Sequence, residues 1–211
     1  MEYSQNQAEF VQKQNIENVF CKLFDMYESN IKSMEITLQY DTHENSFLER
    51  KTFKGRKAFK ELYNLVDIIY LGYAKKGLIF NDTTQPLDMI KRKKVLNVIQ
   101  ESYKEFDNNF QAYIGFYFRN LYYTINYINE QKILSKQEKL FYINMLRGQI
   151  TLYELLLLFC NCLSEKGYSK FKPLIEKYGF LKHILIVKDK LIDQSNTDHT
   201  VLYEKSAYDI K

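Results

Sequence analysis

Turn-forming residues are scarce in this chain, whose 211 residues include only 7 Gly and 2 Pro. Glycine supplies the positive φ of tight turns and proline presets their first corner, so such a chain reverses direction rarely. An all-β domain needs a turn every several residues. The sequence therefore predicts few, long elements and argues against an all-β fold. At this length we expect one domain with a sizeable core.

Apolar residues recur every three or four positions along most of the chain, which is the period of one helical face. The clearest runs begin at Ile16, Phe59, Ile90 and Phe110. They predict an all-α fold, a single-domain helical bundle of about six to eight helices. Residues 38–54 break the period and are typical of a polar loop, while Met34–Tyr40 shows strand-like alternation but could equally extend the first helix. Asp107-Asn108-Asn109 predicts a break between two helices.

Two capping boxes mark helix starts. Ser135 with Glu138, and Thr151 with Glu154, have the spacing in which a hydroxyl accepts from a free amide while the carboxylate reaches back. The second box leads into a run that is apolar on all sides, so we expect residues 151–163 to form the buried centre of the bundle. Gly179 is predicted to end a helix over residues 169–178.

Composition indicates how the chain divides into domains and in which cellular compartment it works. We expect a helical domain over residues 1–193 and a polar, weakly docked tail over 194–211. The net charge of +4, from 30 basic and 26 acidic residues, is too mild to indicate nucleic acid by itself. Cysteines without framework spacing suggest reduced thiols, and no signal peptide or membrane span is recognisable. We therefore expect a cytoplasmic protein with no metal or other cofactor.

Five segments carry a resemblance to a known family. They are GRKAFKELY (55–63), FYFRNLYYTI (116–125), YINMLRGQITLYEL (142–155), LFCN (158–161) and FKPLIEKY (171–178). In this order they resemble the putative phage abortive infection family, often called AbiC-like. The resemblance implies a bacterial protein of anti-phage defence, and it implies no settled catalytic mechanism.

Polar residues inside these apolar segments are the candidate site. They are Arg119, Arg147, Gln149, Glu154 and Asn161. Buried polar groups must be paired, so these residues could form a structural network that fixes helix register, or they could form a recognition or catalytic site. We favour the structural interpretation. It predicts that Ala at Arg119 or Arg147 unpairs a buried group and lowers thermal stability.

Two basic clusters could bind a phosphate backbone if the fold joined them. They comprise Arg56, Lys57, Lys91, Arg92, Lys93 and Lys94. Two solvated helix faces are the simpler interpretation, because the net charge is low. A helical defence protein also invites comparison with the HEPN ribonucleases, but no catalytic His follows Arg119 or Arg147 at the spacing of that family. We identify no catalytic residues and no positive indication of an enzyme.

Two mechanisms remain open. The first is a sensor or protein-interaction module that binds a phage or host protein, as a monomer or a homo-oligomer. The second is a toxin effector that binds or cleaves nucleic acid on a HEPN-like fold without the usual catalytic His. We favour the first, because the chain is rich in aromatic residues, with 18 Tyr and 15 Phe, and lacks a recognisable nucleophile–base pair.

Overall fold

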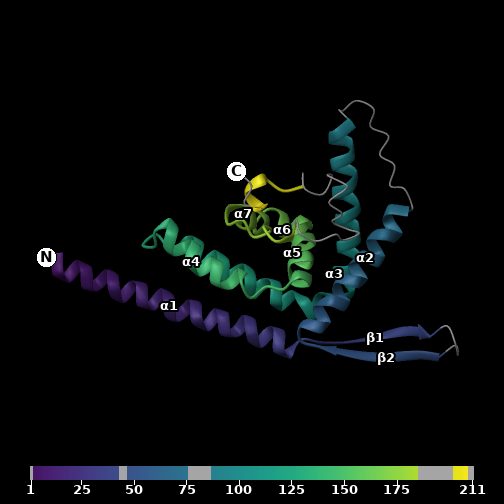
Figure 1. Cartoon of the computed structure of the whole chain (residues 1–211), viewed down its shortest axis with the longest axis horizontal. Helices are drawn as coiled ribbons and strands as arrows, with labels where there is room; N and C mark the ends of the chain where they lie inside the picture. The colour runs from purple at the N-terminus through teal and green to yellow at the C-terminus, as the bar shows by residue number, and fades with distance from the viewer. Residues whose placement is uncertain (1, 43–46, 76–86, 185–201, 209–211) are drawn as a thin grey trace.

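The computed structural model describes residues 2–42, 47–75, 87–184 and 202–208 (Figure 1). Within these ranges it is an all-α bundle with one added β-hairpin, as the helical periodicity predicted. The elements are α1 (Glu2–Ser33), β1 (Glu35–Thr42), β2 (Phe47–Lys54), α2 (Arg56–Lys75), α3 (Leu87–Glu130), α4 (Lys136–Arg147), α5 (Leu152–Leu163), α6 (Glu165–Tyr168), α7 (Phe171–Lys177) and the 3₁₀ helix η3 (Lys205–Tyr208).

The centre of the bundle is α5. Its residues from Glu154 to Cys160 are all buried, and α2, α3, α6 and α7 pack around it. Both predicted capping boxes are present, at Ser135–Glu138 and at Thr151–Glu154. Gly179 has a φ of 59° and follows Tyr178, the C-cap residue of α7, which confirms the predicted helix stop.

The longest element is α3, whose 44 residues span about 66 Å. It continues through Asp107-Asn108-Asn109, so the predicted break there is wrong. Asn108 and Asn109 face solvent, and Asn109 donates to the carbonyl of Glu105 within the same helix (2.9 Å). Exposed Asn costs a helix only a few tenths of a kcal/mol, which the packing of the rest of α3 outweighs.

Residues 35–42 and 47–54 form two antiparallel strands and not the expected loop. Figure 1 shows them extending away from the helices at the junction of α1 and α2. Ile36 is paired with Phe53 on the face that packs against the core, and Thr37 is paired with Thr52 on the opposite face. The alternation noted at Met34–Tyr40 was therefore a strand signal. Residues 43–46 lie outside the described part of the chain.

The expected weak docking of the C-terminal segment is wrong for residues 202–208. Leu202, Tyr203, Ala207 and Tyr208 are buried. The Tyr203 hydroxyl donates to the carbonyl of Phe159 in α5 (2.6 Å). Residues 194–201 and 209–211 lie outside the described residues, and the domain boundary near residue 193 stays a prediction.

No single helix in the described ranges is long and apolar enough to cross a membrane. Only α4 and α5 taken together reach the required length and composition, and they are bent by 116° at the break between them.

Buried tyrosines make the fold sensitive to alkali. Burial raises the pKa of Tyr27, Tyr103, Tyr117 and Tyr203 above the ordinary value of about 10. Their contribution to stability is complete below pH about 10 and falls as pH rises further, because only the unfolded chain then loses these protons. Above pH about 10 we expect the tyrosinate absorbance to increase as the helical circular dichroism signal decreases. Titration of all tyrosines while the helices stay intact would contradict this.

Candidate functional site: a cationic pocket beside the long helix

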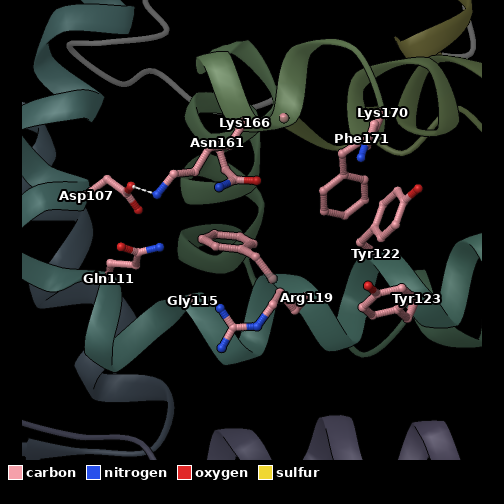
Figure 2. Close-up of a pocket in the computed structure, with 12 residues that line it drawn as sticks. Asp107, Gln111, Gly115, Arg119, Tyr122, Tyr123, Asn161, Lys166, Lys170 and Phe171 are labelled. Carbon is pink, nitrogen blue, oxygen red and sulfur yellow. Dashed lines mark hydrogen bonds and ion pairs between the residues drawn. The ribbon is translucent and has the colours of Figure 1, made fainter.

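A pocket of about 270 Å³ lies between α3 and the α5–α7 segment (Figure 2). One wall is a row on α3 at four-residue intervals, which places its members along one side of the helix. The row is Asp107, Gln111, Gly115, Arg119 and Tyr123. The opposite wall is formed by Asn161, Lys166, Gly167, Lys170 and Phe171. Phe118 and Tyr122 complete the lining.

Arg119 is exposed, in contrast to the buried position expected from the apolar residues around it. Its guanidinium lies against the bare backbone of Gly115, where a methyl group would come within 3.4 Å of Nη1. Among the described residues it has no hydrogen-bond or ion-pair partner. The premise that its removal would unpair a buried group therefore does not hold.

The pocket carries an excess of positive charge. Lys166 and Lys170 join Arg119, and Asp107 is the only carboxylate in the lining. Lys166 Nζ lies 2.5 Å from Asp107 Oδ2, the interaction drawn in Figure 2. Two positive charges remain without a paired carboxylate in the pocket, so the site favours an anion.

Aromatic rings form the other chemical feature of the pocket. The Tyr122 ring packs edge-on against Phe171, with centroids 5.5 Å apart, and against Tyr123 at 5.4 Å. Tyr123 is 60% exposed, so its ring is accessible from solvent. On the opposite wall, the Asn161 amide donates to the Tyr103 hydroxyl (3.0 Å), which holds this side chain in place.

The turn from α5 to α6 depends on Gly167. A methyl group at this position would overlap the carbonyl oxygen of Asn161 and lie 2.8 Å from Cα of Cys162. Only glycine lets α6 approach α5 this closely. That approach positions Lys166 next to Asn161 within one wall of the pocket.

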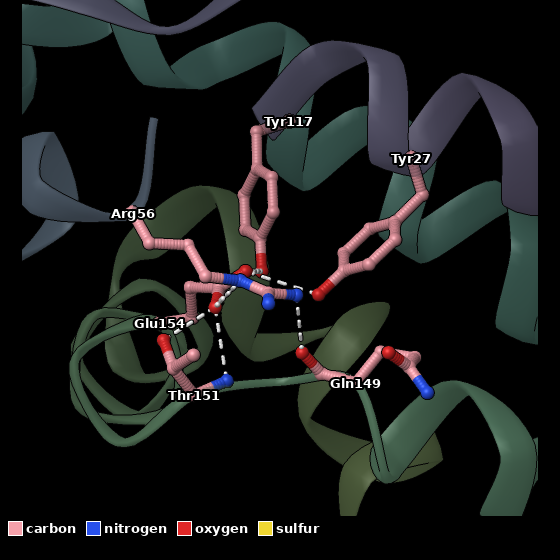
Figure 3. A network of polar contacts seen from close by, with 6 residues as sticks. All are labelled: Tyr27, Arg56, Tyr117, Gln149, Thr151 and Glu154. Carbon is pink, nitrogen blue, oxygen red and sulfur yellow. Dashed lines mark hydrogen bonds and ion pairs between the residues drawn. The ribbon is translucent and has the colours of Figure 1, made fainter. Parts of the chain in front are cut away.

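A second polar cluster surrounds Glu154, which is completely buried (Figure 3). The hydroxyls of Tyr27 and Tyr117 each donate to Oε1 at 3.0 Å. The Thr151 amide (2.9 Å) and the Thr151 hydroxyl donate to Oε2. Arg56 Nε lies 3.6 Å from Oε2, and its Nη2 donates to the carbonyl of Gln149 (2.8 Å). The cluster joins α1, α2, α3 and α5 through one carboxylate whose lone pairs are occupied.

The five candidates from the sequence thus separate into three places. Arg119 and Asn161 meet at the pocket, whereas Glu154 and the backbone of Gln149 belong to the buried cluster. Arg147 lies elsewhere and donates to the carbonyls of Gly179 (2.9 Å) and Tyr178 (3.4 Å) at the end of α7. A cation there lies next to carbonyls just past the C-terminus of α7, which fits a structural role for Arg147.

The two basic clusters do not form one surface. Arg56 and Lys57 begin α2 beside the hairpin, whereas Arg92, Lys93 and Lys94 lie near the start of α3, towards the other end of α2 (Figure 1). A helix of 20 residues such as α2 spans about 30 Å. The side chain of Lys91 lies outside the described part of the structure.

Thiol and metal chemistry find little support within the described residues. Cys160 and Cys162 are buried, and burial raises the pKa of the Cys162 thiol well above its ordinary value. A group of three or more His, Cys, Asp or Glu side chains placed to hold a metal ion is absent from these ranges.

Comparison with known proteins finds one family that is similar to the part of the chain that lines the pocket. A model of the family described as "Putative phage abortive infection protein" matches residues 109–188. These residues are similar to that family, and the match covers less than half of the chain. Residues 109–188, called the abortive infection segment below, contain every lining residue of the pocket except Asp107. No curated protein and no solved structure matches the chain.

The match confirms the resemblance drawn from the sequence. Three of the resembling segments, 116–125, 158–161 and 171–178, each contribute residues to the pocket. The segment at 55–63 lies outside the matched region. Sequence reasoning selected Arg119 and Asn161 but missed Gln111, Gly115, Lys166 and Lys170. The four-residue row on α3 was the signal that could have found the first two.

Proposed function

We propose that this protein defends bacteria against phage as a sensor or protein-interaction module, and that the pocket beside α3 recognises its partner, a phage or host protein. One observation carries the proposal. Three segments of abortive infection type meet at a single open pocket, and its guanidinium has no partner among the described residues. Because Arg119 is exposed, its guanidinium is accessible to a binding partner.

The rim of the pocket supports a macromolecular partner. Tyr123, which lines the pocket from α3, is 60% exposed. Tyrosine and arginine are enriched where proteins bind one another, because each combines a large contact area with a polar tip. An exposed Arg119 next to Tyr123 has this composition.

The alternative, a toxin that acts on nucleic acid, receives less support from the geometry. Its basic residues lie in two separated groups, and the guanidinium of Arg56 is engaged with Glu154 and Gln149. Arg92, Lys93 and Lys94 remain exposed on α3 and are the residues that this alternative requires. Salt-sensitive binding of RNA or DNA that weakens when these three are neutralised would favour it.

Replacing Arg119 by Ala is expected to abolish protection. Cells carrying the variant should plaque like cells without the gene, while the purified variant keeps its thermal stability to within about 0.5 kcal/mol, as an exposed substitution should. Arg92→Ala is the matched control, since it removes an exposed arginine from the same helix outside the pocket. Full protection by Arg119→Ala would refute the proposed site, and its loss in Arg92→Ala would favour the nucleic-acid alternative.

A further inference from the structure

We propose that the pocket binds a doubly charged anion attached to a flat ring, that is, an aromatic or heteroaromatic phosphate monoester. This inference rests on the proposed function, because it names the chemical group that the recognition site takes from its partner. It is drawn from three features of the lining, namely its charge, its rings and the glycine beneath Arg119.

The charge of the pocket fits a dianion. Its three cationic side chains face a single carboxylate, that of Asp107, which is already paired with Lys166 at 2.5 Å. Arg119 on the α3 wall and Lys170 on the opposite wall have no carboxylate partner in the lining (Figure 2). A phosphate monoester carries a charge of about −1.5 to −2 at neutral pH and offers three acceptor oxygens, and a guanidinium can bind two of them side by side.

The rings of the pocket fit a flat group next to that phosphate. Phe118, Tyr122, Tyr123 and Phe171 contribute aromatic surface to the same cavity. Rings placed edge-on or offset attract one another beyond simple burial. The volume of about 270 Å³ is near the small end for ligand pockets, so it suits one ring with one phosphate and not an extended chain.

Gly115 makes room for the guanidinium. It lies in the interior of α3, where glycine costs a helix about 0.5–1 kcal/mol relative to alanine. A methyl group there would lie 3.3 Å from Gln111 Cγ, so that side chain would have to give by a few tenths of an ångström, and it would touch Arg119 Nη1 at 3.4 Å. The helix thus contains a destabilising residue at the position in the pocket wall that lies against the Arg119 guanidinium.

The experiment titrates the purified full chain with phenyl phosphate, inorganic phosphate and benzoate at low salt, by calorimetry or by chemical-shift changes. We expect phenyl phosphate to bind roughly tenfold more tightly than either of the others, because they lack the ring or the second charge. Added salt should weaken binding. Arg119→Gln should weaken it at least tenfold, whereas Arg92→Gln should leave it unchanged.

A pair of glycine variants distinguishes an effect on ligand affinity from an effect on helix stability. Gly115→Ala should raise the thermal midpoint yet weaken phenyl phosphate binding several-fold. Gly72→Ala, at an exposed position in α2 with no atom within 4 Å of the added methyl, should raise the midpoint without changing affinity. Equal affinity in both variants would overturn the role assigned to Gly115 and with it the proposal.

Two further ligands identify the source of the anion. A peptide containing phosphotyrosine carries the phenyl phosphate group itself, whereas a nucleoside monophosphate carries its phosphate on the ribose and not on the ring. Tighter binding of the peptide supports the inference and names its source, and tighter binding of the nucleotide overturns it. No binding of phenyl phosphate by the folded protein overturns it. If Arg119→Ala nevertheless abolishes defence, the proposed function stands and only this inference fails. If phenyl phosphate binds but Arg119→Ala protects fully, the inference stands and the proposed function fails.

Discussion

Replacing Glu154 by Ala should lower the free energy of unfolding by about 3–5 kcal/mol, the cost of breaking a buried ionic cluster. The carboxylate is fully buried and accepts from Tyr27, Tyr117 and Thr151. Without it, two buried hydroxyls and the first turn of α5 lose their acceptor, and Arg56 loses its counter-ion. Few domains of this size can lose so much stability and remain fully folded at growth temperature.

Denaturant unfolding measures this effect. Glu17→Ala is the matched control, because Glu17 is an exposed helical glutamate whose loss should change stability by no more than about 0.5 kcal/mol. Tyr27→Phe and Tyr117→Phe should each destabilise less than Glu154→Ala, and their effects should not be additive, since both hydroxyls donate to the same oxygen. An unchanged midpoint for Glu154→Ala would show that the carboxylate does not hold the helices together.

Gly167→Ala is the second substitution with a large expected effect. The added methyl would overlap the Asn161 carbonyl, and backbone atoms cannot move aside as a side chain can. Overpacking of this kind costs about 1–3 kcal/mol or more, and we expect the upper end. The variant should also lose protection against phage, because α6 carries one wall of the pocket.

Gly72→Ala serves again as the control, because it makes the same chemical change in open space. It should be neutral or stabilising. The thermal midpoints of the two variants should be compared. A drop in Gly167→Ala alone reports the close approach of α5 and α6, and a drop in both would report a general effect of alanine. A Gly167→Ala protein as stable as the parent would mean that α6 can move without cost.

The elements that the sequence predicted well are those with strong local signals. The apolar residues of α5, its Thr151 cap and the positive φ of Gly179 each follow from a few neighbouring residues. The hairpin was missed because Glu49, Arg50 and Lys51 obscure its alternation, and because the pairing of Ile36 with Phe53 joins residues 17 positions apart. Local periodicity does not report such pairing.

The sequence predicted only some of the pocket residues, for a similar reason. Arg119 sits between the buried residues Phe118 and Asn120, so its neighbours suggest a core position, although it faces a narrow open strip of α3. Lys166 and Lys170 belong to a different part of the chain and look like ordinary surface lysines. Only the packing of α5–α7 against α3 brings these cations to one pocket, and tertiary packing of this kind leaves no local pattern.

The contacts of the buried Glu154 also bear on whether residues 109–188 could fold apart from the rest of the chain. Two of its partners, Tyr27 in α1 and Arg56 in α2, come from the part of the chain that precedes the abortive infection segment. Residues 109–188 expressed alone would contain a carboxylate without half of its partners. The segment is therefore not an exchangeable module, and a graft onto another scaffold would have to supply a new phenol and a new cation for Glu154.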